Sequence, residues 1–251
     1  NESYVLWQWL LGDSATTGST TSPAGSLAST SIVADAGHFS VMTYTGSGAN
    51  ATVGHGLGAA PTMVLIKNLE TAENWLAWHE GLTSAQYFLN LNTTGAEFDN
   101  GASGYFRGTA PNATVITMND SSYNTSSRDY IAYCFKSVAG VCKVGTYEGN
   151  NNANGTYVNL GFTPAFFMAK NIDATGSWFI IDNKRGFNSA SNEAYLQAES
   201  NTTETVGNVA DLLSDGVKWR TTGGGNASNT FIYIAMADIG GNGTLPPVYG
   251  R

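Results

Sequence analysis

Charged residues are scarce in this sequence. Asp, Glu, Lys and Arg make up 12% of its 251 residues, compared with roughly 25% in typical globular proteins. Only 11 residues are Lys or Arg, against 19 Asp and Glu, and no basic run occurs. Because binding to a phosphate backbone needs clustered cations, we expect no nucleic-acid partner. No apolar run approaches the length of about 18 residues that spans a bilayer, so we also expect no membrane insertion.

Cysteine is rare as well. The chain contains only Cys134 and Cys142, which excludes a disulfide-rich scaffold. A bridge across the seven intervening residues stays open from the sequence alone. Cys134 is matched by Ala235 in the repeat described below, and an Ala/Cys exchange indicates a small buried residue.

Motifs for catalysis and for cofactor binding are missing. The three histidines, His38, His55 and His79, follow no metal-ligand spacing, and no nucleophile elbow, P-loop or complete dinucleotide-binding fingerprint occurs. The glycine-rich stretch 54–58 precedes a predicted strand instead of following one, which favours a turn. We therefore expect a protein that is not an enzyme and that has no cofactor and no metal.

Carboxylates leave two alternatives open. A glycoside hydrolase needs two carboxyl groups about 5–9.5 Å apart, and the candidates here are Glu97, Asp99, Asp120 and Asp129. Loops with suitable oxygen ligands for calcium contain Asp99, Asn100, Asp120, Asp173 or Asp211. No EF-hand spacing supports a calcium site, and the sequence does not bring any pair of carboxylates together.

An internal repeat is the strongest pattern that the sequence does contain. Segments 43–79 and 146–182 match without gaps at an offset of 103 residues. Tyr44 therefore corresponds to Tyr147, and Trp75 corresponds to Trp178. Later matches need small shifts in stretches rich in Gly, Asn, Ser and Thr, where loops tolerate them. The predicted organisation is a last strand of an upstream element (1–11), a low-complexity connector (12–37), repeat 1 (39–138), repeat 2 (142–240) and a C-terminal tail (241–251). The connector is expected to become strand-like at 29–34.

Short strands are predicted throughout both repeats. Runs of β-branched and aromatic residues alternate with polar loops at 40–45, 63–67, 75–79, 85–91, 115–118, 130–135, 143–147, 166–170 and 178–182. A helical turn is expected only at 208–213. The fold class is therefore all-β, an antiparallel β-sandwich of the lectin-like jelly-roll type built from two internal repeats. Each copy could form its own small sandwich, or the two could share one, which is the arrangement we prefer because each copy offers one apolar face that its twin can cover.

Two duplicated tryptophans give the candidate ligand-contact residues. A Trp at matched positions most often anchors a core, but Trp75 follows Asn74 and Trp178 follows Ser177, and small neutral polar groups beside an aromatic ring suit sugar hydroxyls. Strand alternation places Trp78 on the opposite face from Trp75. The predicted contact residues are Asn74, Trp75, Trp78, His79, Ser177 and Trp178.

The sequence also resembles a known family. The stretches 51–68, 74–75 and 129–135, followed by 161–164, 170–171, 177–178 and 216–220 in the second copy, are similar to a duplicated C-terminal β domain of tail-fibre-like and other virion surface proteins of tailed marine bacteriophages. The resemblance covers nearly the whole chain. It implies a virion-surface location and contacts with other virion proteins, but no catalytic residues that could be carried over.

Three functions remain open from the sequence. The first is a non-catalytic adhesion module of tail-fibre or spike type, a trimer that contacts host surface glycan or protein. The second is a purely structural virion subunit, such as a capsid decoration or cement protein. The third is a polysaccharide depolymerase. The scarcity of site-like motifs favours the first two.

Overall fold

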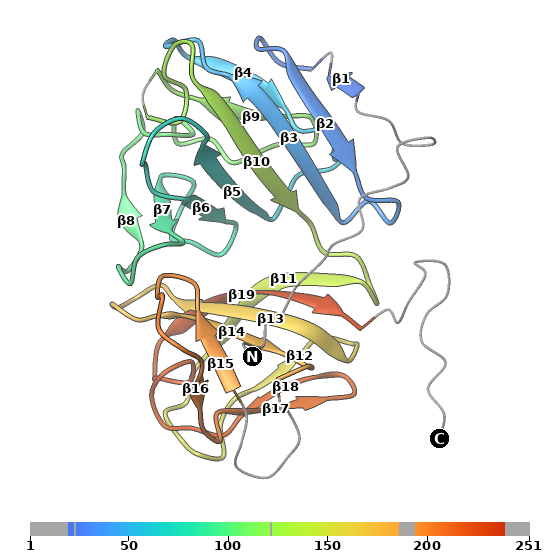
Figure 1. Cartoon of the computed structure of the whole chain (residues 1–251), viewed down its shortest axis with the longest axis vertical. Coiled ribbons are helices and arrows are strands. Elements are labelled where there is room, and N and C mark those ends of the chain that lie inside the picture. Colours follow the sequence, from blue (N-terminus) through green and yellow to red (C-terminus); the bar gives the residue numbers. More distant parts are fainter. Residues whose placement is uncertain (1–19, 23, 121, 186–193, 239–251) are drawn as a thin grey trace. The chain divides into compact units, whose positions relative to one another are not determined.

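The computed structural model describes residues 20–22, 24–120, 122–185 and 194–238. Over these residues the chain is all-β, with 19 strands and no helix. It folds as two compact units that divide between Val138 and Ala139. We call residues 20–138 the first unit and residues 139–238 the second unit (Figure 1). The predicted upstream strand (1–11) and C-terminal tail (241–251) lie outside the described residues.

The first unit contains an eight-stranded antiparallel sheet and a separate strand pair. The sheet order is β1-β2-β3-β10-β5-β6-β7-β8. The bounds are β1 Thr20–Ser22, β2 Ser29–Val33, β3 Phe39–Thr45, β10 Asp129–Phe135, β5 Met63–Asn68, β6 Leu76–His79, β7 Tyr87–Asn90 and β8 Phe98–Asp99. The pair consists of β4 (Ala51–Gly54) and β9 (Val115–Met118). β2 confirms the strand predicted at 29–34. β1 also falls in the range predicted as connector, so the sheet begins at Thr20.

The second unit contains a six-stranded antiparallel sheet and a three-stranded one. The larger sheet has the order β11-β19-β13-β14-β15-β16 and the smaller one the order β12-β18-β17. The bounds are β11 Cys142–Glu148, β12 Tyr157–Asn159, β13 Pro164–Asn171, β14 Trp178–Asp182, β15 Ala194–Gln197, β16 Thr205–Val206, β17 Ala210–Leu213, β18 Gly216–Trp219 and β19 Thr230–Ala237.

Corresponding strands occupy corresponding places in the two larger sheets. From β3 onward the order in the first unit matches the complete order in the second. The registers agree as well, because Tyr130 pairs with Tyr44 and Asn68, and Phe231 pairs with Tyr147 and Asn171. Descent of the two units from one duplicated ancestor stays a prediction.

Two sheets pack face to face in the second unit. Trp219 of β18 is fully buried, and its ring centroid lies 6.2 Å from Phe167 of β13 and 6.2 Å from Tyr147 of β11. These residues belong to one core with Val217 and Phe231. Facing sheets with a shared apolar core are a β-sandwich. Removal of an aromatic side chain from such a core costs about 3–5 kcal/mol.

The first unit has a core of its own. Trp78 of β6 packs against Phe106 at 6.1 Å between ring centroids, and Val53 of β4 and Ile116 of β9 are fully buried. Because the core of the second unit runs from Tyr147 to Ala235, the arrangement with a separate sandwich in each copy is correct. The preferred arrangement, in which both copies share a single sandwich, is wrong.

The structure also differs from the sequence-based expectation at 208–213 and leaves both cysteines unbridged. The helical turn at 208–213 is wrong, because Ala210–Leu213 is β17 and pairs with β18. Ala210 and Leu212 are both buried while the residues between and after them are partly exposed, and a period of two is that of a strand. Cys134 and Cys142 are both buried and carry free thiols, so no disulfide joins them.

Each unit also contains what we call a tyrosine–asparagine junction. The hydroxyl of Tyr44 donates to the carbonyl of Tyr123, and that of Tyr147 donates to the carbonyl of Gly225, each at 2.6 Å. The next residue in both cases is a fully buried asparagine, Asn124 or Asn226. Buried polar groups must be hydrogen-bonded, so each junction ties a strand of the large sheet to a loop.

The side-chain amides of these asparagines are hydrogen-bonded on both the nitrogen and the oxygen. Asn226 Nδ2 donates to the carbonyls of Asn152 and Thr221 at 2.9 and 2.8 Å, and its Oδ1 accepts from the backbone N–H of Thr156. Asn124 Nδ2 donates to the carbonyls of Ala49 and Asn119 at 2.6 and 2.7 Å. Each side chain therefore replaces several backbone partners that its loops would otherwise lack.

Candidate functional site

The outward side of the eight-stranded sheet in the first unit is partly open, and we call it the open face. Successive side chains of a strand point to opposite sides. In β3, Met42 and Tyr44 are buried, whereas Thr43 and Thr45 are exposed. In β10, Ala132 is buried, whereas Ile131 and Tyr133 are half-buried. The open face thus presents threonine hydroxyls, aliphatic carbons and one phenol.

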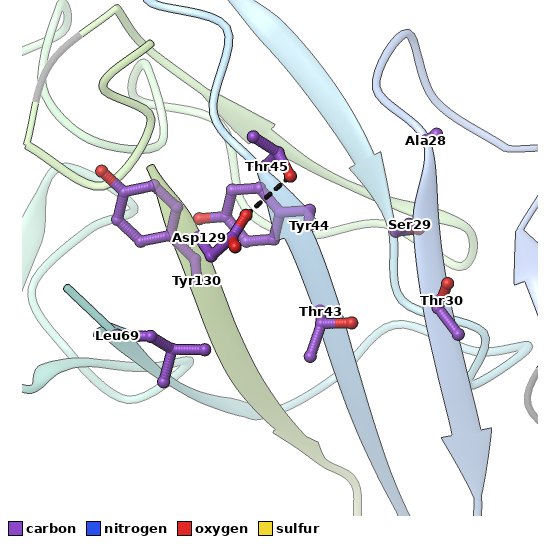
Figure 2. A pocket seen from close by; sticks show the side chains of 9 residues that line it. All are labelled: Ala28, Ser29, Thr30, Thr43, Tyr44, Thr45, Leu69, Asp129 and Tyr130. Atoms are coloured by element: carbon purple, nitrogen blue, oxygen red, sulfur yellow. Dashed lines mark hydrogen bonds between the residues drawn. The ribbon is translucent and has the colours of Figure 1, made fainter. Parts of the chain in front are cut away.

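A hollow of about 470 Å³ lies on this face. Its exposed side chains are Thr30, Thr43, Thr45, Leu69 and Asp129. Ala28 and the buried residues Ser29, Tyr44 and Tyr130 complete the lining. Figure 2 shows these residues spread over β2 and the residue before it, β3, β10 and the residue that follows β5. The hollow therefore combines hydroxyl groups, one carboxylate and one apolar side chain.

Asp129 and Thr45 are joined at the rim of the hollow. Thr45 Oγ1 donates a 2.7 Å hydrogen bond to Asp129 Oδ1 (Figure 2). Because the two residues are register partners in the β3–β10 ladder, the bond is set by the sheet itself. It fixes the direction of the carboxylate and leaves the second oxygen, Oδ2, able to accept a bond from a ligand.

A row of side chains crosses the sheet beside the hollow. Thr30 pairs with Thr43, Thr43 with Ile131, and Ile131 with Lys67. Lys67 Nζ donates to the carbonyls of Thr71 and Glu73 at 3.2 and 2.7 Å. The ammonium group is thus held by the loop after β5, so the open face presents no cation that is available for an anionic ligand along this row.

Of the predicted contact residues, Asn74 and Trp75 reach the surface. Asn74 is exposed and Trp75 is half-buried. Asn92 binds both, because its Nδ2 donates to Asn74 Oδ1 and its Oδ1 accepts from the backbone N–H of Trp75, each at 2.9 Å. The Trp75 ring lies 6.0 Å from the ring of Tyr133. Contact with a ligand stays a prediction for these two residues.

The other four predicted contact residues are buried or belong to the second unit. Trp78 and His79 are buried, with 4% and 1% of their surface exposed, and His79 Nδ1 accepts a 2.8 Å bond from the backbone N–H of Gly81. Trp178 is 1% exposed. The hydroxyl of half-buried Ser177 accepts a 2.8 Å bond from Gln197. The sequence matches Trp75 to Trp178, yet Trp75 is half-buried and Trp178 is buried.

The corresponding face of the second unit is closed. Val144, Met168, Ile232 and Ile234, which take the places of outward side chains in the first unit, are all buried. Lys170, the counterpart of Lys67, is completely buried, and burial lowers the pKa of Lys170 to about 8, while Glu199 acts in the opposite direction. The hollow of the first unit therefore lies on a face whose counterpart in the second unit is covered at these positions.

His55 has a structural role in the first unit. His55 is buried, its Nε2 donates to the Asn112 carbonyl at 3.0 Å and its Nδ1 accepts from the Leu57 backbone N–H at 3.1 Å. Burial lowers the pKa of His55, although the bond to Asn112 opposes this shift, and burial also lowers the pKa of His38. Within the described residues, no group of three or more His, Cys, Asp or Glu side chains could hold a metal ion.

Three of the candidate carboxylates serve local structure. Glu97 accepts bonds from the backbone and the hydroxyl of Thr83, Asp99 caps the turn at Gly101, and Asp129 binds Thr45. Each is engaged by a different loop or strand. Asp129 was considered from sequence only as half of a catalytic pair, whereas the structure places it beside exposed threonines.

The described residues form an all-β protein whose first unit has a partly open, largely neutral sheet surface. Comparison with family models matches residues 1–239 to the domain of unknown function DUF7483, and the chain belongs to this family. Neither a curated protein nor a solved structure matches it. In the part of the chain that the structure describes, no helix is long and apolar enough to cross a membrane.

Proposed function

We propose that the chain is a non-catalytic adhesion module of a virion surface that binds a neutral glycan through the open face of its first unit. The observation that carries this proposal is the hollow beside the Thr45–Asp129 hydrogen bond, where Thr30 and Thr43 present further hydroxyls. Hydroxyl and carboxylate oxygens are suitable partners for sugar hydroxyls, and an adjacent apolar group suits the carbon face of a sugar ring.

Charge favours a neutral ligand over an anionic one. The net charge of the chain is −8, and Asp129 lies at the rim of the hollow. An anionic sugar would meet repulsion from both, since like charges placed close together are unfavourable. A neutral hexose would not be repelled by these negative charges, and its hydroxyls could donate hydrogen bonds to the carboxylate, which is a strong acceptor.

The remaining parts of the proposal come from the sequence. The resemblance to virion surface proteins of tailed marine bacteriophages supports a location on the particle, assembly as a trimer and contacts with other virion proteins. A surface that is poor in charge and rich in neutral polar side chains is consistent with such a location. Host-surface protein is the alternative ligand to glycan.

The test compares two matched threonines. Thr43 lies in the hollow, and Thr146 occupies the corresponding exposed position of the second unit. The full chain is titrated by calorimetry with neutral glycans, namely gluco-, manno- and galacto-oligosaccharides. Thr43→Val should weaken binding about five- to tenfold, as expected when one hydrogen bond is lost, and Thr146→Val should leave it unchanged. The proposal would be contradicted if none of the three oligosaccharide series bound to the wild-type chain.

A purely structural virion subunit is the second candidate. It is favoured by the exposed apolar side chains Leu69, Tyr157 and Val206, which have 55%, 40% and 56% of their surface exposed, because such side chains are often buried at contacts between subunits. Imaging of assembled particles distinguishes the two: a lattice position on the capsid with the open face covered supports a structural subunit. A depolymerase has less support, because three of the four candidate carboxylates are engaged separately in local structure.

A further inference from the structure

We infer that Trp75 and Tyr133 form a second sugar subsite next to the hollow, so that the open face binds a glycan chain of at least two rings. This inference rests on the proposed function and extends it to a ligand of defined length. It assigns a binding role to Tyr133, which the sequence did not single out.

Position on the sheet is the first argument. Tyr133 lies two residues after Ile131 in β10, on the same side, and Ile131 pairs with Thr43 of the hollow. Two residues along a strand span about 7 Å. The aromatic pair is therefore a neighbour of the hollow on one continuous surface, close enough for one saccharide chain to contact both.

The geometry of the two rings is the second argument. Their centroids lie 6.0 Å apart with a tilt of 34°, so neither ring covers the other face to face. The backbone of Trp75 is fixed by the hydrogen bond from its N–H to Asn92. The ring of Tyr133 also stacks on the ring of Phe39, at 6.2 Å between centroids. Tyr133 belongs to a central strand that pairs with β3 and β5. Rings that are held in place in this way offer apolar contact at little cost in conformational entropy.

The polar atoms of the pair are the third argument. Among the described residues, no protein group accepts a hydrogen bond from the indole N–H of Trp75 or bonds to the hydroxyl of Tyr133. Amphipathic rings of this kind present an apolar body together with one polar atom. This combination matches a sugar ring, which has an apolar carbon face and peripheral hydroxyls.

The second unit provides an internal comparison. The positions of Trp75 and Tyr133 correspond to Trp178 and Ile234, and both of these are buried, at 1% and 3% exposure. The aromatic hydroxyl and the partial exposure are thus particular to the first unit, the same unit that has the hollow. In the second unit Ile234 occupies the position of Tyr133, so the fold does not require an aromatic hydroxyl there.

The experiment measures how affinity depends on glycan length. The full chain is titrated with gluco-, manno- and galacto-oligosaccharides of one to four rings. We expect the wild type to gain about tenfold or more in affinity between one ring and three rings, as a second stacking contact predicts. Trp75→Ala and Tyr133→Ala should remove most of this gain and leave the affinity for the single ring within about twofold.

Tyr157→Ala is the matched control, because Tyr157 is an exposed aromatic residue of the second unit, and it should keep the gain with length. Circular dichroism of each variant reports whether it folds, and Trp75→Phe and Tyr133→Phe, which keep an aromatic ring, should restore most of the gain. The inference is overturned, and the proposed function stands, if affinity rises equally with glycan length in the wild type and in both alanine variants. Failure of every oligosaccharide to bind the wild type overturns both.

Discussion

Thr45 and Asp129 are joined by a 2.7 Å hydrogen bond between the side chains of two paired strands at the rim of the hollow. Because the Thr45 hydroxyl donates to Asp129 in the absence of a ligand, the carboxylate is already oriented when a ligand binds. A carboxylate oriented in this way binds a sugar hydroxyl without a further loss of rotamer freedom.

Neutralising this carboxylate should weaken glycan binding. Asp129→Asn keeps the size of the side chain and removes the charge, and hydrogen bonds to charged acceptors are about twice as strong as neutral ones. We expect a loss of about five- to tenfold in affinity by calorimetry. Glu148→Gln, which removes an exposed carboxylate from the second unit, should have no effect. Equal losses in both variants would show that net charge, not the position of Asp129, is responsible.

The tyrosine–asparagine junctions predict large effects on stability. Asn226→Ala removes a buried amide that two loops depend on, and orphaned buried groups cost about 1–3 kcal/mol each. We expect the free energy of unfolding of the second unit to fall by about 3 kcal/mol or more in urea titration. Asn201→Ala, at an exposed position of the same unit, should change it little. A loss below about 1 kcal/mol for Asn226→Ala would contradict the structural role.

Gly149 should not tolerate a side chain. A Cβ atom at this position would overlap the carbonyl oxygen of Ala227 and lie 2.8 Å from the carbonyl carbon of Asn226, and these are backbone atoms that cannot rotate away. Gly149→Ala should therefore destabilise the second unit by about 2 kcal/mol or more. Gly207 has open space around it, so Gly207→Ala should be nearly neutral in the same urea measurement.

Stability should also depend on the neutral state of His55. Burial holds the pKa of His55 below its ordinary value of 6.5, and protonation of Nδ1 would break the bond from the Leu57 backbone. As the pH falls below about 6.5, the unfolded chain binds the proton first, so stability is complete above this pH and declines below it.

The measurement is the urea midpoint of the first unit between pH 5 and pH 8. His55→Asn, whose amide offers one donor and one acceptor but does not titrate, should flatten part of this dependence. His38 should account for another part, because its pKa is lowered in the same direction. A urea midpoint that rises as the pH falls would contradict this prediction.

The alternation of residues was sufficient to predict most of the large sheets. The run 40–45 alternates between core and exposed positions, and β3 is observed at Phe39–Thr45. The short strands β4, β12 and β17 were not predicted. The equally short β9 was predicted, because three of its four residues are β-branched. Ala210 and Leu212 of β17 are good helix formers, so this run was assigned to a helical turn.

The candidate site was predicted only in part. Repetition identified Trp75 and Trp178 as a pair, but it could not show that one is half-buried and the other buried, since exposure depends on neighbours such as Tyr133 and Ile234. The hollow depends on strand register, which brings Thr30, Thr43 and Asp129 together from distant parts of the chain. A signal was present in the exposed threonines of 43–45, but threonine is too common here to single them out.

The junction asparagines have a consequence for producing the protein. Asn124 and Asn226 each lie in an Asn-X-Ser/Thr sequence, one of ten in the chain that a eukaryotic secretory pathway reads as a glycosylation signal. Both side chains are fully buried, and an attached oligosaccharide would take the place of the amide hydrogens that hold the loops. Expression in a glycosylating host should therefore yield misfolded material unless these two sites escape modification, whereas a bacterial host avoids the conflict.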